Sequence, residues 1–524
     1  MRSKKILSIL MALVFVTAAF CGCNGGETLS EAGSANENNR QAESSEVPLE
    51  SSGDESDVQI EPYHLTLSYI GSEQQTQEDV YSAINALTST QLNITVDFIR
   101  MDWGDYGQKL QLMLAGGDEL DILPVYYSSA NSYVNSGYLE NLTDLLESRG
   151  NGIIEALGNE IAYAGNASGI TYGIPTAKEC NAGGGVFMRA DLVQKYHIDI
   201  DAIHSFTDLT TVYETVSAGE SGMYMITGTN LNSQVRNYDS LMDDFGVLLD
   251  GGQSLEVVNL YETALFEQRV MLFHEWYEKG YYYKDAATTT ETAKELMSAG
   301  NLFSYFTGIK PGILTQEQSD VGYDLVPVYI TDNEGETNEY AYSHNVNFIN
   351  WGIAANSENP ERAMDFLNFA YTSGDFHNLF NWGIEGQDYV RIEGTENLIK
   401  FPEGVTSDTT GYRRNMGWLL FNQFIGYAWE GNDDDVWEQY EENNNRATKS
   451  KAFGFMYDST SVVDEISALT NVTNQYLNAL VTGSVDPETV LPEFNKALYD
   501  AGLQKVMETK QEQLDTWCAE KGIQ

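Results

Sequence analysis

The chain has 524 residues, with 78 acidic and 28 basic side chains, so its formal net charge is −50. A field of that sign repels phosphate backbones and anionic membrane surfaces, which argues against nucleic acid as a partner and against electrostatic docking on a membrane. A chain of this length exceeds the usual limit for one hydrophobic core, so at least two lobes are expected.

The first 22 residues predict an export signal. A basic head at 2–5 precedes an apolar run at 6–20 that is too short to span a bilayer. The ending Phe20-Cys21-Gly22-Cys23 resembles the bacterial lipobox, whose last cysteine is acylated and becomes the mature N-terminus. We therefore expect a lipid on Cys23 and a location on the extracytoplasmic face of the cell membrane. Simple secretion after cleavage near Gly22 is the alternative.

Residues 23–62 predict an extended tether. Ser, Asn, Gly and Glu dominate this stretch, and it contains no aromatic residue. Such a segment cannot bury enough apolar surface to fold. Its many acidic side chains face a single base, Arg40, so the segment repels itself and extends.

The region after the tether reads as alternating strands and helices. Apolar residues alternate at 65–69, repeat at helical spacing at 80–87 and alternate again at 94–98, which predicts a parallel strand, helix, strand unit. A third apolar run covers 120–127, and a helix-like pattern follows at 139–146. The first lobe is therefore expected to be α/β.

Two later helices are also predicted. Asn359 followed by Pro360 is typical of a helix start, and apolar residues then share one face as far as Tyr371. Another helical region covers 463–480 and stops near Gly483. Beyond the N-terminal region, the cysteines are Cys180 and Cys518, and we expect two free, mostly buried thiols.

Motifs for catalysis and for metal ions are missing from the sequence. It has no phosphate loop, no nucleophile elbow and no Cys-x-x-Cys pair, and its six histidines are not closely paired as zinc ligands would be. The run Asp433 to Asp435 lacks the central glycine and terminal acid of a calcium loop. No cofactor and no metal site are therefore expected. A glycosidase stays open as the enzyme alternative, because it needs only two carboxylates about 5 to 10 Å apart.

Several segments together resemble a known family. They resemble the family 1 extracellular solute-binding proteins of ABC transporters, and the C-terminal ones resemble a lipoprotein subgroup that carries its own C-terminal domain. The segments are 115–123, 136–144, 172–175, 187–192, 299–303, 352–354, 359–364, 381–386, 422–424, 454–458 and 511–517.

The resemblance implies an α/β, two-lobed periplasmic-binding-protein-like fold of type II, with the lobes joined by a hinge of crossing segments. Lobe 1 would comprise 63–180 and 354–400, and lobe 2 would comprise 181–353 and 401–524, including the C-terminal subgroup domain. Ligand binding would close the hinge, and the closed form would be recognised by ABC permease subunits whose ATPase is a separate cytoplasmic protein. The receptor itself is expected to be a monomer.

The resemblance also suggests residues that contact the ligand. Aromatic platforms are expected from Tyr126 or Tyr127 in the first lobe, from Tyr305 and Phe306 in the second, and from Trp418. A sugar has an apolar C–H face and a hydroxyl rim, so aromatic rings with polar groups at their edge suit it. The further candidates are Asp121, Glu179, Asn347, Trp351, Glu385 and Arg414. Each of these has a structural alternative, such as capping, packing or counter-charge.

The leading function is a receptor that delivers a carbohydrate, in particular an oligosaccharide, to an ABC importer. A sugar-sensing lipoprotein without a transport role and an extracellular glycoside hydrolase are the alternatives. The identity of the substrate stays open at this stage: an acidic sugar is conceivable through Arg413 and Arg414, and a peptide or polyol is not dismissed.

Overall fold

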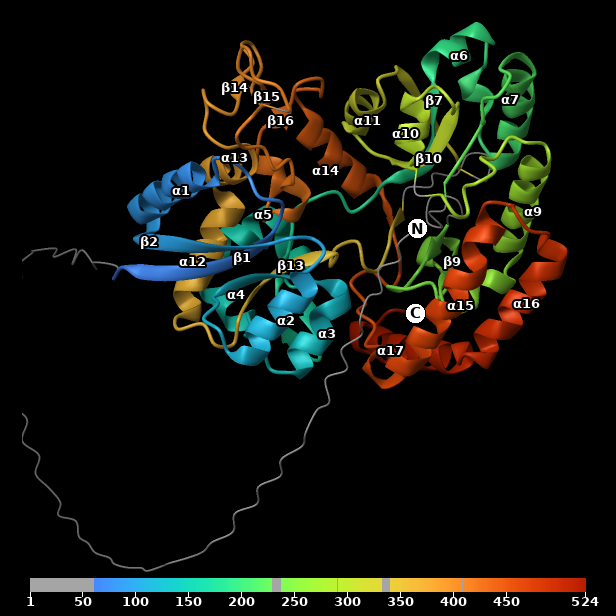
Figure 1. Ribbon diagram of the computed structural model, residues 1–524. Helices are drawn as coiled ribbons and strands as arrows, with labels where there is room; N and C mark the ends of the chain where they lie inside the picture. The colour runs from blue at the N-terminus through green and yellow to red at the C-terminus, as the bar shows by residue number, and fades with distance from the viewer. Residues whose placement is uncertain (1–60, 229–236, 290, 332–339, 408) are drawn as a thin grey trace, which may run out of the picture. The chain divides into compact units, whose positions relative to one another are not determined.

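The computed structural model describes residues 61–228, 237–289, 291–331, 340–407 and 409–524. Residues 60–524 form one compact unit, which contains two separate larger β-sheets with helices around each (Figure 1). The expected signal, the lipidated cysteine and nearly all of the tether lie outside the described residues.

The first sheet has five strands in the order β2-β1-β3-β13-β6. Its strands are β1 (Tyr63–Ile70), β2 (Ile94–Met101), β3 (Ile122–Tyr126), β13 (Ile349–Ile353) and β6 (Ile174–Pro175). The predicted strand, helix, strand unit is confirmed, because β1 and β2 pair in parallel and α1 (Gln77–Leu92) connects them. Strand β13 runs antiparallel to both of its neighbours, β3 and β6.

Helices bury both faces of the first sheet. Side chains alternate along β3, so that Ile122 packs in one core cluster while Leu123 and Val125 pack in another. The surrounding helices are α2 (Tyr106–Gly116), α3 (Tyr127–Asn135), α4 (Thr143–Arg149), α5 (Asn151–Ala162), α12 (Pro360–Thr372) and α13 (Gly374–Trp382). The predicted start of α12 is confirmed, since the Asn359 side chain accepts a hydrogen bond from the Arg362 backbone N–H at 3.2 Å.

The second sheet is antiparallel, with β7 (Gly183–Arg189) between β10 (Ser304–Ile309) and β11 (Leu325–Tyr329). Every residue of β7 is buried. Gly185 is required there, because a Cβ atom at this position would lie 2.1 Å from the Val328 carbonyl oxygen. The helices around this sheet are α6 (Ala190–Lys195), α7 (Phe206–Gly219), α9 (Ala264–Glu278), α10 (Ala293–Ser298) and α11 (Ile313–Val321).

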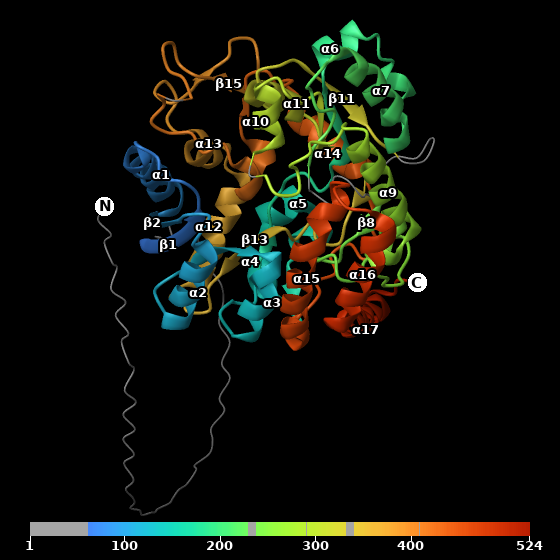
Figure 2. The same ribbon diagram turned by 45° about the vertical axis from the view of Figure 1, so that its right-hand side comes forward.

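Three long helices end the chain and pack on one another, and the first two of them also pack on α9 (Figure 2). They are α15 (Val463–Val481), α16 (Pro487–Asp500) and α17 (Leu503–Lys521). The predicted helix that stops near Gly483 is confirmed by α15, since Gly483 takes a φ of +71° just after the helix. None of the described helices combines the length and the apolar character needed to cross a membrane. Cys180 and Cys518 are both free thiols.

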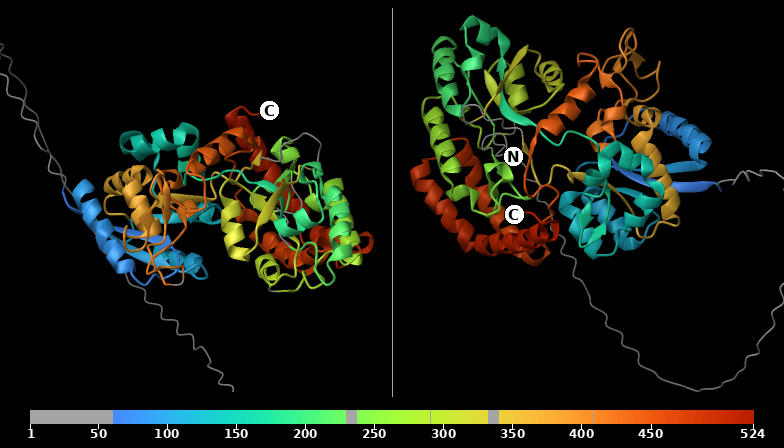
Figure 3. Two further views of the ribbon diagram at one scale, coloured as in Figure 1. Left: turned by 90° about the horizontal axis from the view of Figure 1, so that it is seen from above. Right: turned by 180° about the vertical axis from the view of Figure 1, so that it is seen from behind.

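The chain passes from β6 in the first sheet to β7 in the second and returns to the first at β13 (Figure 3). Two expected lobe boundaries differ from the packing. Residues 349–353 were expected in lobe 2, but they form β13 and fill the gap between β3 and β6. Phe421 was expected in lobe 2 as well, yet its ring stacks on Trp351 at 4.3 Å in the core of the first sheet.

Candidate functional site

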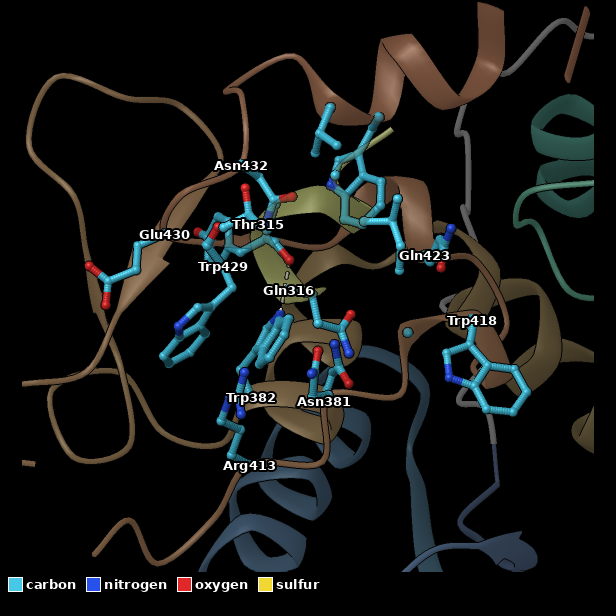
Figure 4. Close-up of a pocket in the computed structure, with 18 of the residues that line it drawn as sticks. Thr315, Gln316, Asn381, Trp382, Arg413, Trp418, Gln423, Trp429, Glu430 and Asn432 are labelled. Carbon is cyan, nitrogen blue, oxygen red and sulfur yellow. Dashed lines mark hydrogen bonds between the residues drawn. The ribbon is translucent and has the colours of Figure 1, made fainter. Parts of the chain in front are cut away.

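A cavity of about 810 Å³ lies among three segments of the chain (Figure 4). The first segment is α11 with the residues before it, the second is the C-terminal half of α13, and the third is the stretch 401–440. The third segment contains one short strand, two short helical turns and the start of α14 (Val436–Arg446). Four of the eight tryptophans of the chain line this cavity, which distinguishes it chemically from ordinary surface.

One group of lining side chains combines three rings and a cation. The ring centroids of Trp382 and Trp429 are 5.3 Å apart, and those of Phe401 and Trp429 are 4.5 Å apart. The Arg413 guanidinium carbon lies 4.4 Å from the Trp429 ring centroid. Trp382 donates a hydrogen bond to the Tyr427 carbonyl oxygen at 3.0 Å, which fixes the indole. We call Trp382, Phe401, Arg413 and Trp429 the Arg413 cluster.

A small sheet positions Trp429 within this cluster. Strand β15 (Leu398–Lys400) pairs with β14 (Val390–Arg391) on one side and with β16 (Ala428–Trp429) on the other. In this register Trp429 stands opposite Ile399, whose side chain is fully buried. The ring therefore rests on a rigid element rather than on a free loop.

A second group of rings belongs to the start of α14 and the turn before it. Trp437 packs against Tyr440 at 5.5 Å and against Phe424 at 6.1 Å between ring centroids. Trp437 also donates a hydrogen bond to the Gly426 carbonyl oxygen at 2.7 Å. Trp437 and Tyr440 both line the cavity.

Trp418 forms a third aromatic platform. It stacks on Trp103 with a centroid distance of 6.0 Å and an interplanar angle of 23°. Trp103 is 49% exposed, an unusual state for a tryptophan side chain. Two stacked indoles with an open face suit a flat apolar ligand surface with a polar rim.

Amide side chains supply the polar part of the lining. Gln316 and Asn381 lie in the middle of the view in Figure 4, with Trp429 on one side and Trp418 on the other. The Asn381 side-chain oxygen accepts a hydrogen bond from the Met416 backbone N–H at 2.7 Å, which fixes its orientation. Asn415, Gln423 and Asn432 add further amides to the lining. An amide both donates and accepts, as a ligand hydroxyl does, so these groups can pair with hydroxyls in either direction.

Glu179 does not line the cavity itself, but it binds two residues that do. Its carboxylate accepts from Lys310 Nζ at 2.6 Å and from Gln423 Nε2 at 3.2 Å, and both of these residues line the cavity. Burial opposes ionisation of this carboxyl, but Lys178 and Lys310 together lower the pKa of Glu179 to about 2. Glu179 therefore stays charged at neutral pH and neutralises Lys310.

Of the ligand residues predicted from the sequence, Trp418 lines the cavity. Tyr126 and Tyr127 lie near it without lining it: both pack on Phe348, at 5.6 and 5.8 Å between ring centroids, and Phe348 in turn contacts Trp418. The two second-lobe candidates lie deeper. Tyr305 donates a hydrogen bond to Glu317 at 2.6 Å, and Phe306 packs on Phe206 in the core of the second sheet.

The remaining candidates do not line the cavity either, and most of them have structural partners. Asp121 is buried and accepts from Tyr63 Oη at 2.6 Å and from the Thr66 backbone N–H at 2.9 Å. Buried Asn347 and Trp351 donate to the carbonyl oxygens of Ala164 and Leu419. Arg414 donates to the hydroxyls of Tyr69 and Tyr412, each at 2.6 Å, and Glu385 is exposed.

Sequence reasoning missed three of the lining rings, namely Phe401, Trp429 and Trp437. It considered Trp382 without choosing between packing and binding, and it named Arg413 only together with Arg414, as a conceivable contact for an acidic sugar. The available signal was the density of tryptophan, because four of the eight fall between 382 and 437. Among the residues that the structure describes, no group of acidic, histidine or cysteine side chains could hold a metal ion.

Comparisons with known proteins point in one direction. The family model described as "Bacterial extracellular solute-binding protein" matches residues 82–382, and a "Domain of unknown function" matches 451–519. A carbohydrate ABC transporter substrate-binding protein of Streptococcus pneumoniae serotype 4 is 26% identical over 472 residues, which is 87% of this chain and 91% of that protein.

Two solved structures are also similar. The crystal structure of the N-glycan transport solute binding protein NgtS from Streptococcus pneumoniae matches with a TM-score of 0.77 at 25% identity, covering 88% of this chain and all of that one. The same protein in complex with Man5GlcNAc matches with a TM-score of 0.65 at 25% identity, over the same shares of the two chains.

Proposed function

The chain belongs to the bacterial extracellular solute-binding protein family, and from this premise we propose that it is the oligosaccharide receptor of an ABC importer. The predicted family and the predicted two-lobed, type II α/β fold are both confirmed by these matches. The relatives are named as substrate-binding and solute-binding proteins, and one was solved with an oligosaccharide.

The observation that carries the proposal is the composition of the cavity. Its wall alternates flat aromatic rings, from Trp382, Trp418, Trp429 and Trp437, with amide side chains. Rings cover the apolar faces of sugar units, while amides pair with their hydroxyls. A volume of about 810 Å³ with several separate platforms suits a ligand of several sugar units better than a single one.

The mechanism that we propose is closure about the two crossing segments. One crossing joins β6 to β7 and carries Glu179, whose carboxylate binds Lys310 and Gln423 in the wall of the cavity. The other returns at β13. A ligand that contacts both lobes stabilises the closed arrangement by its differential affinity, and the permease would recognise that arrangement.

We also propose that a lipid on Cys23 holds the receptor on the extracytoplasmic face of the membrane, with the acidic tether between lipid and receptor. Confinement near a permease raises the effective concentration of the loaded receptor. The receptor would act as a monomer, and it would leave its ligand chemically unchanged.

The test is a binding screen of the purified protein by thermal shift, followed by calorimetry on each hit. The panel contains neutral and acidic oligosaccharides, monosaccharides, polyols and short peptides. We expect oligosaccharides to raise the melting temperature and to be recovered intact by chromatography. Release of reducing ends over hours would support a glycoside hydrolase instead, and a panel in which no carbohydrate binds would contradict the proposal.

A further inference from the structure

Arg413 is the most unusual charged residue of the cavity wall. Its guanidinium carbon lies 4.4, 5.6 and 5.9 Å from the ring centroids of Trp429, Phe401 and Trp382. Figure 4 shows the side chain beside Trp382 at the edge of the cavity. Cation–π contact of this kind stabilises the guanidinium, but it leaves the N–H donors in the plane of the group without acceptors.

Throughout the described part of the chain, no carboxylate lies within ion-pair distance of Arg413, and its buried Nε has no hydrogen-bond partner. Neighbouring cations differ in this respect. Lys310 is paired with Glu179 at 2.6 Å, and Lys294 is paired with Asp320 at 2.7 Å. In a protein with 78 acidic and 28 basic side chains, the missing partner is not due to a shortage of acids.

The adjacent Arg414 has a structural role and can be compared with Arg413. Arg414 is 9% exposed, and its guanidinium donates to the hydroxyls of Tyr69 and Tyr412. Arg413 has rings around it but no acceptor. The two arginines were indistinguishable in the sequence, and the structure separates them into one satisfied group and one with free donors.

A guanidinium donor that is shielded from water and has no acceptor is costly, and Arg413 is partly buried with such a donor at Nε. Burial lowers the pKa of Arg413, and the carboxylate of Asp320 offsets this only in part. An arginine nevertheless stays protonated at neutral pH. The lining carboxylates compensate its charge only in part, since Asp320 is also engaged by Lys294 and Glu430 is exposed. Hydroxyls of a neutral sugar can accept from these donors, but only an anionic group of the ligand would also neutralise the charge.

We infer that Arg413 binds a carboxylate of the ligand, and that the oligosaccharide therefore contains an acidic sugar. The inference rests on the proposed function and names the substrate class of the same site. A carboxylate matches the planar fork of a guanidinium with two parallel hydrogen bonds, while the adjoining sugar ring covers Trp429 or Trp382. Two kinds of sugar supply this chemistry, namely a hexuronic acid unit and a terminal sialic acid.

Calorimetry with paired probes tests this inference on the purified protein. One pair is trigalacturonic acid and its methyl ester, and the other is sialyllactose and lactose. We expect the wild-type protein to bind at least one acidic probe roughly 30-fold more tightly than its neutral counterpart, and Arg413→Met to abolish that ratio. Arg413→Lys should restore only part of it, because an ammonium cannot make the bidentate contact. The pair that responds identifies the kind of acid.

Arg391→Met is the matched control. Arg391 is exposed, and its guanidinium carbon lies 5.3 Å from the Tyr427 ring centroid. It therefore contacts an aromatic ring as Arg413 does, but it does not line the cavity. The Arg391→Met variant should keep the wild-type ratio between the affinities for the acidic and the neutral probe. Equal affinity of the wild type for acidic and neutral probes, or an unchanged ratio in folded Arg413→Met, would overturn the inference and leave the receptor function standing. Failure of every sugar, acidic or neutral, to bind would overturn both.

Discussion

Two cavities in the described part of the chain differ in their chemistry, and the larger of them has fewer tryptophans in its wall. The cavity with the Arg413 cluster measures about 810 Å³, while a second one of about 1050 Å³ lies among α5, the segment 453–458 and α17. The second cavity has one tryptophan, Trp517, and several charged side chains along its wall, including Glu160, Glu512 and Glu520. Rings and amides line both cavities, and we place the ligand in the first because four tryptophans line it, against one in the second.

The largest effect is expected from removing the central ring of the first cavity. Trp429→Ala takes away the platform that Arg413 and Phe401 both contact, so affinity for any oligosaccharide hit should fall about 100-fold. Calorimetry measures the change. If a folded Trp429→Ala protein kept its affinity, the ligand would have to bind elsewhere, and the second cavity would be the next place to look.

Ion pairs in the two walls offer the next comparison. Glu179→Gln leaves the largely buried ammonium of Lys310 without its partner, so the free energy of unfolding should fall by about 3 kcal/mol in urea titrations at neutral pH. The matched change in the second cavity, Glu160→Gln, removes an exposed pair with Lys449 and should cost less than about 1 kcal/mol. Equal losses of unfolding free energy in the two variants would contradict the view that the Glu179 pair is buried and the Glu160 pair is exposed.

The same carboxylate predicts a pH dependence. The folded state holds the pKa of Glu179 at about 2, below the ordinary value of 4.5, so the folded state binds this proton less tightly than the unfolded state does. The stabilisation is complete above pH 4.5 and is lost as the pH falls from there towards 2. Urea titrations of wild type and Glu179→Gln across that range should therefore converge, whereas a constant gap would show that the pKa is not lowered.

A moderate effect is expected at the outer platform. Trp418→Ala should weaken oligosaccharide binding about tenfold, because one ring face is lost while the Arg413 cluster remains. An unchanged affinity would mean that the ligand does not extend to Trp418. Shorter oligosaccharides should then bind as tightly as longer ones, which a length series would reveal.

The smallest effect is expected in the second cavity. Trp517→Ala removes a half-buried ring that packs on Phe455, so some stability is lost. Oligosaccharide affinity should stay within about twofold of the wild type, since surface changes away from a binding site have small effects. A larger loss of affinity would assign a binding role to the second cavity.

The regular elements were predictable because their residues carry a local pattern. The alternation at 65–69 and 94–98 and the cap at Asn359 each describe a short stretch of chain, and the structure confirms them. The lobe boundaries failed at β13, because its five residues join the first sheet through pairing with β3 and β6, which no local pattern records.

The site was harder to predict for the same reason. Strands β14, β15 and β16 have two or three residues each, too few for periodicity to show which side Trp429 faces. Arg413 and Arg414 are neighbours with opposite surroundings, and only the fold reveals which one meets the cavity. Trp418 was found by resemblance to the family, and the density of tryptophan around it was the unused signal.

Strand β13 also bears on how the protein reaches its folded state. It completes the first sheet between β3 and β6, yet it is synthesised only after every strand of the second sheet has been made. The N-terminal half of the first lobe therefore emerges with unpaired strand edges that wait for a distant partner, and pairing over such sequence separation is slow. If the predicted signal at 1–22 exports this chain, we expect the delay to help, because a leading part that waits for the last strand of its sheet stays unfolded longer and can thread through a translocation channel.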